Sequence, residues 1–251
     1  MPNNSLNSHL SEPKIAVTSS SFGRSKVLRE KLNKSFKNCF FNELGRPLTE
    51  PELIEFIKDA DAAVVGTEIM TENVLNHAPR LKIISKYGVG LDNIDKNLLE
   101  KRGISLGWTG GVNRRSVAEL TLCFMLGLCR NIFAAGFKLK QSTWEKNGGY
   151  QLTGKTIGII GCGYTGSEVI KLLKPFHCHL LICDIVDKSK FCKEENAFEL
   201  PLEDVVARSN IISLHVPLTS LTKGMVNANL LAKMKSNAFL INTSRGGVVD
   251  Q

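Results

Sequence analysis

The feature that most constrains this chain is a run of glycines between two apolar segments. Residues 156–160 are apolar or β-branched and predict a buried strand, and the pattern G-x-G-x-x-G then occupies residues 161–166. An apolar helical pattern continues to residue 173, and a second strand is predicted over 179–183, with Asp184 directly after it. A strand, a glycine turn, a helix and a strand that ends in an acid together predict a dinucleotide-binding βαβ unit.

Each glycine of this pattern has its own physical role. Gly161 permits the tight turn out of the strand, Gly163 lets the backbone approach a pyrophosphate, and Gly166 lets the helix pack closely on the strand. The start of the helix offers free N–H groups and a partial positive charge to phosphates. The alternative is a glycine-rich turn that binds no ligand, and the flanking pattern argues against it.

Asp184 predicts which dinucleotide binds. It follows the glycines by about 20 residues, where a carboxylate accepts hydrogen bonds from the ribose hydroxyls and repels a 2′-phosphate. We therefore expect NAD rather than NADP as cofactor. Lys188 and Lys190 lie close enough in the sequence to weaken this preference.

Length and composition indicate an ordinary globular chain. Its 251 residues are enough for two modest domains, and hydrophobic residues make up 43%. No apolar run approaches the ~20 residues of a membrane span, so no membrane partner is expected. The polar N-terminus lacks the layout of a signal peptide and predicts a disordered tail. Seven cysteines that occur singly indicate reduced thiols and a cytoplasmic location.

The net charge of +8 favours anionic ligands, including dinucleotides and carboxylates. Nucleic acid is the competing partner. However, the Lys and Arg residues are dispersed, and no basic stripe interleaved with aromatic residues occurs. We therefore expect no nucleic-acid binding.

The first hundred residues alternate between strand and helix patterns. Strands are predicted over 14–19, 62–66, 81–85 and 104–106. Thr49 and Glu52 form a capping box for a helix between the first two of them. Strands separated by helices predict βαβ units and a parallel sheet.

A second group of elements follows. Ser116 and Glu119 form a predicted capping box for a helix that runs to Cys129. This helix is apolar nearly all round, so we expect it to be buried on several sides, as a helix between two domains would be. The polar, glycine-rich residues 141–149 predict a loop. Beyond the glycine unit, strands are predicted over 210–216 and 238–243, with a helix between them capped at Asn227. The fold class is α/β, with two doubly wound parallel-sheet domains over residues 1–111 and 112–251.

Several further segments resemble the D-isomer-specific 2-hydroxyacid dehydrogenases, the family that includes phosphoglycerate dehydrogenase. They cover most of the chain from Ala62 onwards, and their order and spacing together are highly specific. They are residues 86–95, 113–119, 161–166, 213–219 and 241–250. The resemblance implies a flavodoxin-like substrate domain followed by a Rossmann NAD-binding domain.

The resemblance also implies roles for residues outside the glycine pattern. The Gly88-Val89-Gly90 loop presents backbone N–H groups to the substrate carboxylate, and Val89 also lies beside the cofactor. Asn113 matches a position near the substrate. Thr67 matches a substrate-side position where many relatives have Arg or Ser, which leaves the substrate's identity open.

Arg245 matches the catalytic arginine of the family. Its guanidinium can hold a 2-oxo carboxylate and polarise the carbonyl for hydride transfer. His215 matches a strand-end position near the cofactor, and we do not expect it to be the proton donor. The remaining cofactor-side positions are Tyr164, Thr165, Val216, Pro217, Thr243 and Ser244.

The family pattern continues beyond Asp250 with a glutamate and a histidine, and neither occurs here. We therefore expect a truncated NAD-binding domain, an exposed sheet edge and impaired turnover of a small 2-hydroxy acid. Relatives imply a homodimer formed through the cofactor domain. The alternative function is an NAD-sensing interaction protein, similar to the corepressors of the family, without turnover.

Overall fold

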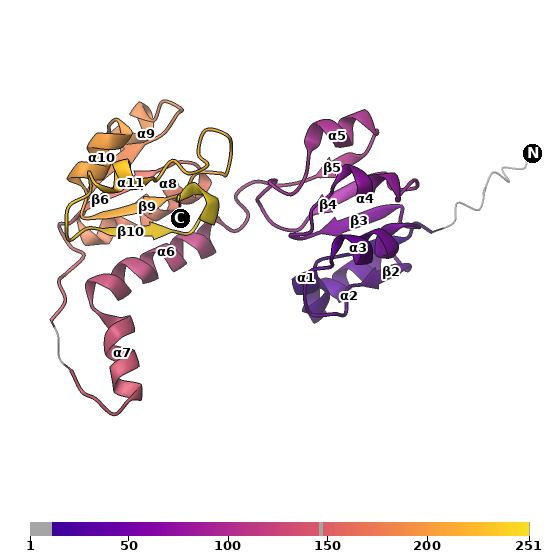
Figure 1. The fold of residues 1–251 in the computed structure, drawn as a ribbon, viewed down its shortest axis with the longest axis horizontal. Coiled ribbons are helices and arrows are strands. Elements are labelled where there is room, and N and C mark those ends of the chain that lie inside the picture. Colours follow the sequence, from indigo (N-terminus) through magenta and orange to yellow (C-terminus); the bar gives the residue numbers. More distant parts are fainter. Residues whose placement is uncertain (1–11, 146–147, 251) are drawn as a thin grey trace, which may run out of the picture. The chain divides into compact units, whose positions relative to one another are not determined.

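The computed structural model describes residues 12–145 and 148–250, and the chain divides into two compact units at Gly110–Gly111 (Figure 1). The division lies one residue before the boundary expected from the sequence. The N-terminal tail, and residues 146–147 of the expected loop, lie outside the described residues. The two units are described separately below as unit 1 and unit 2.

Unit 1 contains a five-stranded parallel sheet with the strand order β2-β1-β3-β4-β5. The chain starts in the middle of the sheet, moves outward to β2 and then returns to the other side of β1, which is the flavodoxin-like order. The strands are β1 (Ile15–Val17), β2 (Cys39–Phe41), β3 (Ala62–Val65), β4 (Ile83–Lys86) and β5 (Ser105–Gly107).

Helices cover both faces of this sheet. They are α1 (Ser20–Arg24), α2 (Lys26–Ser35), α3 (Glu50–Ile57), α4 (Glu72–Asn76) and α5 (Lys96–Lys101). The expected capping box at the start of α3 is confirmed, and the Glu52 carboxylate accepts hydrogen bonds from both the backbone N–H and the hydroxyl of Thr49. Leu53 and Ile57 of α3 are buried in the larger core of the unit.

Unit 2 contains a second five-stranded parallel sheet, ordered β10-β9-β6-β7-β8. Counted within the unit this order is 5-4-1-2-3, which corresponds to the first five strands of a Rossmann sheet. The strands are β6 (Thr156–Ile160), β7 (His179–Cys183), β8 (Ala197–Glu199), β9 (Ile211–Leu214) and β10 (Phe239–Asn242). The predicted α/β class with doubly wound parallel sheets is confirmed.

Two apolar cores lie on the faces of this sheet, and α8 contributes Val169, Ile170 and Leu173 to one of them. The helical elements are α6 (Arg114–Cys129), α7 (Ile132–Lys140), α8 (Tyr164–Leu173), η1 (Lys174–Phe176), α9 (Ser189–Glu195), α10 (Leu202–Arg208), α11 (Ala228–Leu231) and η2 (Gly246–Val248). The expected cap of α11 is confirmed, since the Asn227 side chain accepts the N–H of Leu230 at 3.0 Å.

Helix α6 differs from its prediction at its start. It begins at Arg114 with Asn113 as N-cap, so the capping box expected at Ser116 is wrong. The Glu119 carboxylate accepts instead from Arg115 Nε at 2.6 Å, an i,i+4 pair within the helix. Burial of α6 is also less complete than expected, because Leu120 is 48% exposed.

No single helix in the described ranges combines the length and apolarity needed to cross a lipid bilayer. Among the helices of the described residues, the pair α6 and α7 taken together meets that test, and the chain bends by 70° between them.

Candidate functional site

The predicted cofactor residues of unit 2 meet at one edge of its sheet. They follow the carboxyl ends of four neighbouring strands, β10, β9, β6 and β7. From β6 the successive strands β7 and β8 are added on one side, and the later strands β9 and β10 are added on the other side. The strand order therefore reverses between the neighbouring strands β6 and β9. Ligands of doubly wound sheets bind at the carboxyl ends of the strands, beside such a reversal point.

Gly161 makes the turn out of β6 possible. Its φ is +92°, a conformation that side-chain-bearing residues rarely adopt. A Cβ at this position would also lie 2.9 Å from the His215 carbonyl oxygen and 2.8 Å from Val216 Cγ1. The turn therefore packs directly against the chain that leaves β9.

Gly166 brings the first turn of α8 against the end of β6. A Cβ here would lie 2.1 Å from the carbonyl oxygen of Gly161, so only glycine fits. Gly163 is the N-cap of α8 and carries no capping side chain. A Cβ on Gly163 would meet nothing within 4 Å. The loop thus leaves open space at a helix start that has unsatisfied N–H donors, which suits a pyrophosphate.

Tyr164 and Thr165 occupy the first turn of α8. The Tyr164 ring is exposed and lies so close to Gly111 that a Cβ on that glycine would be 2.5 Å from Tyr164 Cγ. Thr165 is half-buried beside the loop. Both residues lie where the sequence places the pyrophosphate.

Asp184 faces the glycine loop from the end of β7. Its Oδ2 accepts the Cys162 N–H at 2.7 Å, and its Oδ1 accepts the Val186 N–H at 2.9 Å. Lys188 Nζ lies 3.8 Å from Oδ2. The carboxylate therefore holds the loop in place, and each oxygen retains acceptor capacity for a further donor.

The end of β10 forms a hydrogen-bonded turn around Arg245. Asn242 Oδ1 accepts from the backbone N–H of Ser244 at 3.0 Å and from its hydroxyl at 2.8 Å, and Asn242 Nδ2 donates to the Arg245 carbonyl at 2.9 Å. Arg245 Nη1 donates to the Ser244 carbonyl at 3.0 Å. Asn242 was missed at the sequence level. Its signal is an Asn with a Ser two residues on, which is typical of an Asx turn.

Thr243 connects this turn to α6. The Thr121 hydroxyl donates to the Val117 carbonyl at 2.8 Å, so the Thr243 hydroxyl, 3.0 Å from Thr121 Oγ1, is the donor in their contact. Buried Thr121 thus fixes the rotation of the Thr243 side chain at the sheet edge.

His215, Val216 and Pro217 follow β9. His215 Nε2 lies 2.9 Å from Ser213 Oγ, and burial lowers the pKa of the imidazole from 6.5 to about 4. The ring is therefore neutral near pH 7. Val216 is half-buried against Gly161, whereas Pro217 is exposed.

In unit 1, the predicted substrate residues lie on loops that follow β3 and β4. Thr67 is exposed, and the neighbouring Gly66 carbonyl accepts hydrogen bonds from Lys86 Nζ and, at 3.2 Å, from Asn93 Nδ2. Buried Glu68 accepts the Gly66 N–H at 3.0 Å. Lys86, Asn93 and Glu68 were not singled out in the sequence, because such contacts depend on tertiary proximity.

The Gly88-Val89-Gly90 loop begins with a residue of positive φ. Gly88 has φ +123°, and the Val89 carbonyl accepts the Trp108 indole N–H at 3.0 Å. Val89 and Gly90 are half-buried. Asn113, the remaining predicted substrate residue, belongs to unit 2, where it caps α6 through its backbone and makes no capping bond with its side chain.

Cysteine and metal chemistry have little support at this edge. Burial raises the pKa of the Cys162 thiol to about 12, so it is protonated and unreactive at neutral pH. Within residues 12–145 and 148–250, no three His, Cys, Asp or Glu side chains are grouped to hold a metal ion.

The fold and the glycine loop define a dinucleotide-binding α/β protein, and comparison with known proteins identifies its family. Residues 122–251 match the model of the D-isomer specific 2-hydroxyacid dehydrogenase, NAD binding domain. A hydroxypyruvate reductase of Thermotoga maritima is 37% identical over 207 residues, which are 81% of this chain and 67% of that protein. The chain therefore belongs to the D-isomer-specific 2-hydroxyacid dehydrogenase family.

Other relatives agree with this assignment. A D-3-phosphoglycerate dehydrogenase of Methanocaldococcus jannaschii is 38% identical over 83% of this chain, which spans only 41% of that enzyme. The solved D-lactate dehydrogenase of Aquifex aeolicus, in complex with NAD and lactic acid, has a TM-score of 0.79 and 28% identity. The match covers 94% of this chain and 70% of that one. The first of these relatives is thus more than twice as long as this chain.

The lowered pKa of His215 predicts a pH dependence of stability. Because the unfolded histidine binds a proton below pH 6.5 and the folded one only below about 4, stability falls as the pH drops through this window. Between pH 7.5 and 5.0 we expect His215 to remove about 2 kcal/mol of unfolding free energy. Urea titrations of the wild type and of His215→Gln at both pH values measure the difference. An equal pH dependence for the two proteins would contradict the assignment.

Proposed function

We propose that the carboxyl-end edge of the unit 2 sheet binds NAD and that the chain takes part in hydride transfer to or from a small 2-hydroxy acid. The observation that carries the proposal is the glycine loop. Gly166 forces α8 against β6, while Gly163 leaves open space at the uncapped start of that helix. We assign the pyrophosphate to the N–H groups of Gly163, Tyr164 and Thr165, and the adenosine ribose to Asp184.

The remaining edge residues suit the nicotinamide end. Val216 and Pro217 supply an apolar wall, and Thr243 and Ser244 supply hydroxyls on the turn that Asn242 holds. When bound, the cofactor donates or accepts a hydride at its nicotinamide ring. Arg245 would bind the carboxylate of a 2-oxo acid and polarise its carbonyl.

We assign substrate contacts in unit 1 to Thr67 and to the Gly88-Val89-Gly90 loop, and in unit 2 to Asn113. The Gly88 backbone and the Lys86 ammonium support an anion site, because a Cβ on Gly88 would lie 3.9 Å from Lys86 Nζ. Substrate domain and cofactor domain are the proposed roles of residues 1–111 and 112–251.

Proton transfer to the substrate is the step that the described histidines of this edge do not support. Reduction of a 2-oxo acid needs an acid near neutral pH, and His215 is neutral there because its pKa is about 4. Among the described histidines, only His215 lies at this edge of the unit 2 sheet; His177 and His179 lie at the opposite end of β7. We therefore expect slow turnover.

The cofactor assignment predicts the effect of one added methyl group. Gly163→Ala meets no protein atom within 4 Å, so folding and thermal stability should stay unchanged. The same methyl group would occupy the phosphate position, and we expect NADH affinity, measured calorimetrically, to fall at least about tenfold. Gly136→Ala, also in open space but on α7, is the matched control and should bind NADH normally. Equal NADH affinity for both variants would refute the assignment.

Because none of the described histidines is an acid near neutral pH at this edge, we predict slow kinetics. Against pyruvate, glyoxylate and hydroxypyruvate with NADH, we expect kcat far below the ordinary enzyme value of about 10 s⁻¹. Absorbance at the nicotinamide band follows the reaction. Turnover near that ordinary value would show that another described residue, or water, supplies the proton efficiently.

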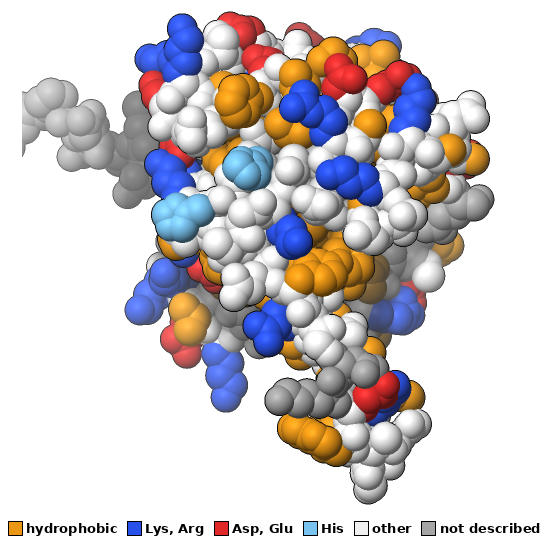
Figure 2. All heavy atoms as spheres, turned by 90° about the vertical axis from the view of Figure 1, so that its left-hand side faces the viewer, with side chains coloured by type: hydrophobic (Ala, Val, Ile, Leu, Met, Phe, Trp, Pro, Cys, Tyr) orange, Lys and Arg blue, Asp and Glu red, His pale blue; other side chains and the backbone are white. Residues whose placement is uncertain are grey.

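We also propose a homodimer formed through unit 2. No residue of α7 is buried, and its apolar side chains include Phe137, which is 64% exposed. Helix α7 extends away from the sheet of its unit in Figure 1, and Figure 2 shows hydrophobic side chains among the Lys and Arg side chains on the face turned to the viewer. A helix this apolar and this exposed suits a self-complementary interface.

The seven free cysteines suit a reducing, cytoplasmic setting.

The dimer proposal predicts that a single charge on α7 dissociates the protein. Phe137→Asp should convert a dimer to a monomer in sedimentation equilibrium, because two carboxylates would be buried at the interface. Leu221→Asp, at a position 80% exposed in the same unit, is the control and should remain dimeric. A wild type that is monomeric at micromolar concentration would contradict the proposal.

A further inference from the structure

Trp108 lies directly after β5, beside the loop that follows β4. The two strands pair in parallel with Ser85 opposite Gly107, so the chain that leaves β5 passes the Gly88-Val89-Gly90 loop. The Trp108 indole Nε1–H donates to the Val89 carbonyl at 3.0 Å. A donor at the end of one strand therefore holds the backbone of the loop at the end of its neighbour.

This hydrogen bond sets the orientation of the peptide group between Val89 and Gly90. No cis peptide bond occurs in the described residues, and in a trans peptide the C=O and N–H groups point in opposite directions. Because the indole holds the Val89 carbonyl on its own side, the Gly90 N–H points away from Trp108. Two glycines in the loop would otherwise let this peptide group rotate, since glycine restricts the backbone least.

The indole ring is positioned from the opposite direction by α5. The ammonium of Lys96, the first residue of that helix, lies 5.7 Å from the centre of the ring, within the range of cation–π attraction. Trp108 is 43% exposed and belongs to neither apolar core of unit 1. The ring therefore contributes little to the core, and its N–H serves the loop.

The N–H groups of the loop have no partner in the described part of the chain. No described residue accepts a hydrogen bond from the backbone N–H of Gly88, Val89 or Gly90. Val89 and Gly90 are half-buried, and the Lys86 ammonium, which bonds the Gly66 carbonyl, lies near Gly88. Backbone donors beside an ammonium group suit a carboxylate, because charge-assisted hydrogen bonds are the stronger ones.

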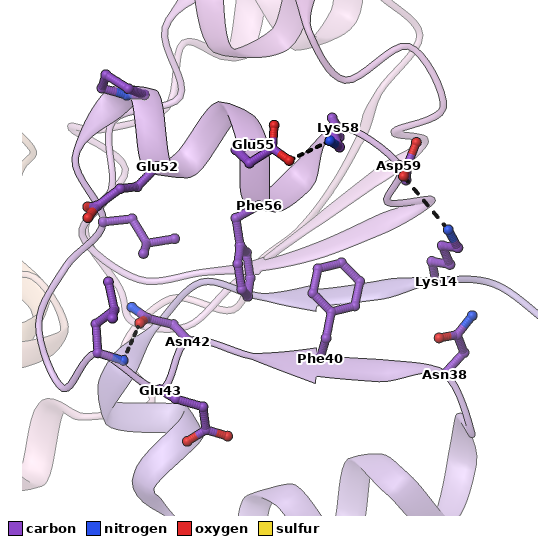
Figure 3. A pocket seen from close by; sticks show the side chains of 13 residues that line it. Lys14, Asn38, Phe40, Asn42, Glu43, Glu52, Glu55, Phe56, Lys58 and Asp59 are labelled. Carbon is purple, nitrogen blue, oxygen red and sulfur yellow. Dashed lines mark hydrogen bonds and ion pairs between the residues drawn. The ribbon is translucent and has the colours of Figure 1, made fainter.

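A larger groove of unit 1 does not offer such donors. It has a volume of about 910 Å³ and lies between β2 and α3, where Figure 3 shows Phe40 and Phe56 with their ring centres 5.0 Å apart. The four carboxylates that line it are each ion-paired, in the pairs Glu43–Arg29, Glu52–Arg46, Glu55–Lys58 and Asp59–Lys14. The groove is therefore apolar and charge-compensated, and it serves below as an internal control.

We propose that Trp108 is a positioning residue for the substrate. By holding the Val89 carbonyl, its indole N–H directs the Gly90 N–H toward the substrate carboxylate. The inference rests on the proposed function, because it takes the loop to receive the carboxylate of a 2-oxo acid. It adds that the direction of the donor is set from β5 by a side chain that acts through the backbone.

The test uses the full chain, labelled with ¹⁵N, and oxamate, an unreactive carboxylate with the shape of pyruvate. Oxamate is titrated without NADH and then with saturating NADH. We expect a saturable shift of the Gly90 amide and no shift of the Phe40 and Asn42 amides beside the groove. Trp108→Phe keeps an aromatic ring and removes the donor, and it should raise the Kd of oxamate at least about threefold.

Two controls separate the donor from the ring and from folding. Trp144→Phe makes the same change at a tryptophan of unit 2 that is 78% exposed, and it should bind oxamate as the wild type does. Replacement of Trp108 by 3-benzothienylalanine keeps the bicyclic ring and puts sulfur in place of the N–H. This replacement should weaken oxamate binding as much as Trp108→Phe, with an unchanged Tm and an unchanged Kd for NADH.

Three results would overturn the inference. They are a wild-type Gly90 amide that does not respond to oxamate, equal oxamate affinity of the wild type and Trp108→Phe, and normal affinity of the benzothienyl variant. Calorimetric titration of NADH into the same samples reports the cofactor site separately. If NADH binds and the Trp108 variants match the wild type, this inference alone fails, whereas absent NADH binding contradicts the proposed function.

Discussion

The structure of unit 2 depends on one backbone contact, between the carbonyl of Gly161 and the α-carbon of Gly166. A single added methyl group at Gly166 would lie 2.1 Å from that oxygen. The contact fixes where α8 begins relative to the end of β6. Because of it, the free N–H groups of the first helical turn face the same edge as the loops after β9 and β10. The helix dipole and the edge residues therefore act on the same region of space.

Both units hold their functional loops by the same physical means. In each, a side chain amide bonds backbone groups of a loop that follows a parallel strand: Asn242 in unit 2, and Asn93 in unit 1. Such bonds satisfy backbone groups that the sheet leaves unpaired where a strand ends. They also restrict the loop to one conformation, which reduces the entropy lost when a ligand binds.

Sequence reasoning predicted best where a local pattern decides the structure. The strands β6 and β7 and the helix α8 follow from apolar periodicity and glycine spacing, and the caps at Thr49 and Asn227 follow from their residue types. The capping box at Ser116 failed because Asn113, three residues earlier, also suits a helix start. The three-residue strands β2 and β8 were missed, whereas β1 and β5, which are equally short, were predicted over 14–19 and 104–106.

The same distinction, between local sequence patterns and contacts made only in the folded protein, applies to the residues of the candidate site. The turn at Gly161 and the close packing at Gly166 could be predicted because local backbone geometry requires a glycine at each position. The contacts of Glu68, Lys86 and Thr121 could not, because they depend on segments brought together by the sheet. The groove beside β2 was also beyond reach, since it requires knowing which strand ends the sheet.

The most direct test of the central claim follows the backbone amides of the glycine loop. Hydrogen–deuterium exchange of the full chain, with and without millimolar NADH, reports each amide from residue 162 to residue 166. The account predicts strong additional protection there, with unit 1 strands unchanged. Unaltered exchange across this loop at saturating NADH, in a sample whose β6 and β9 amides are protected, would contradict it.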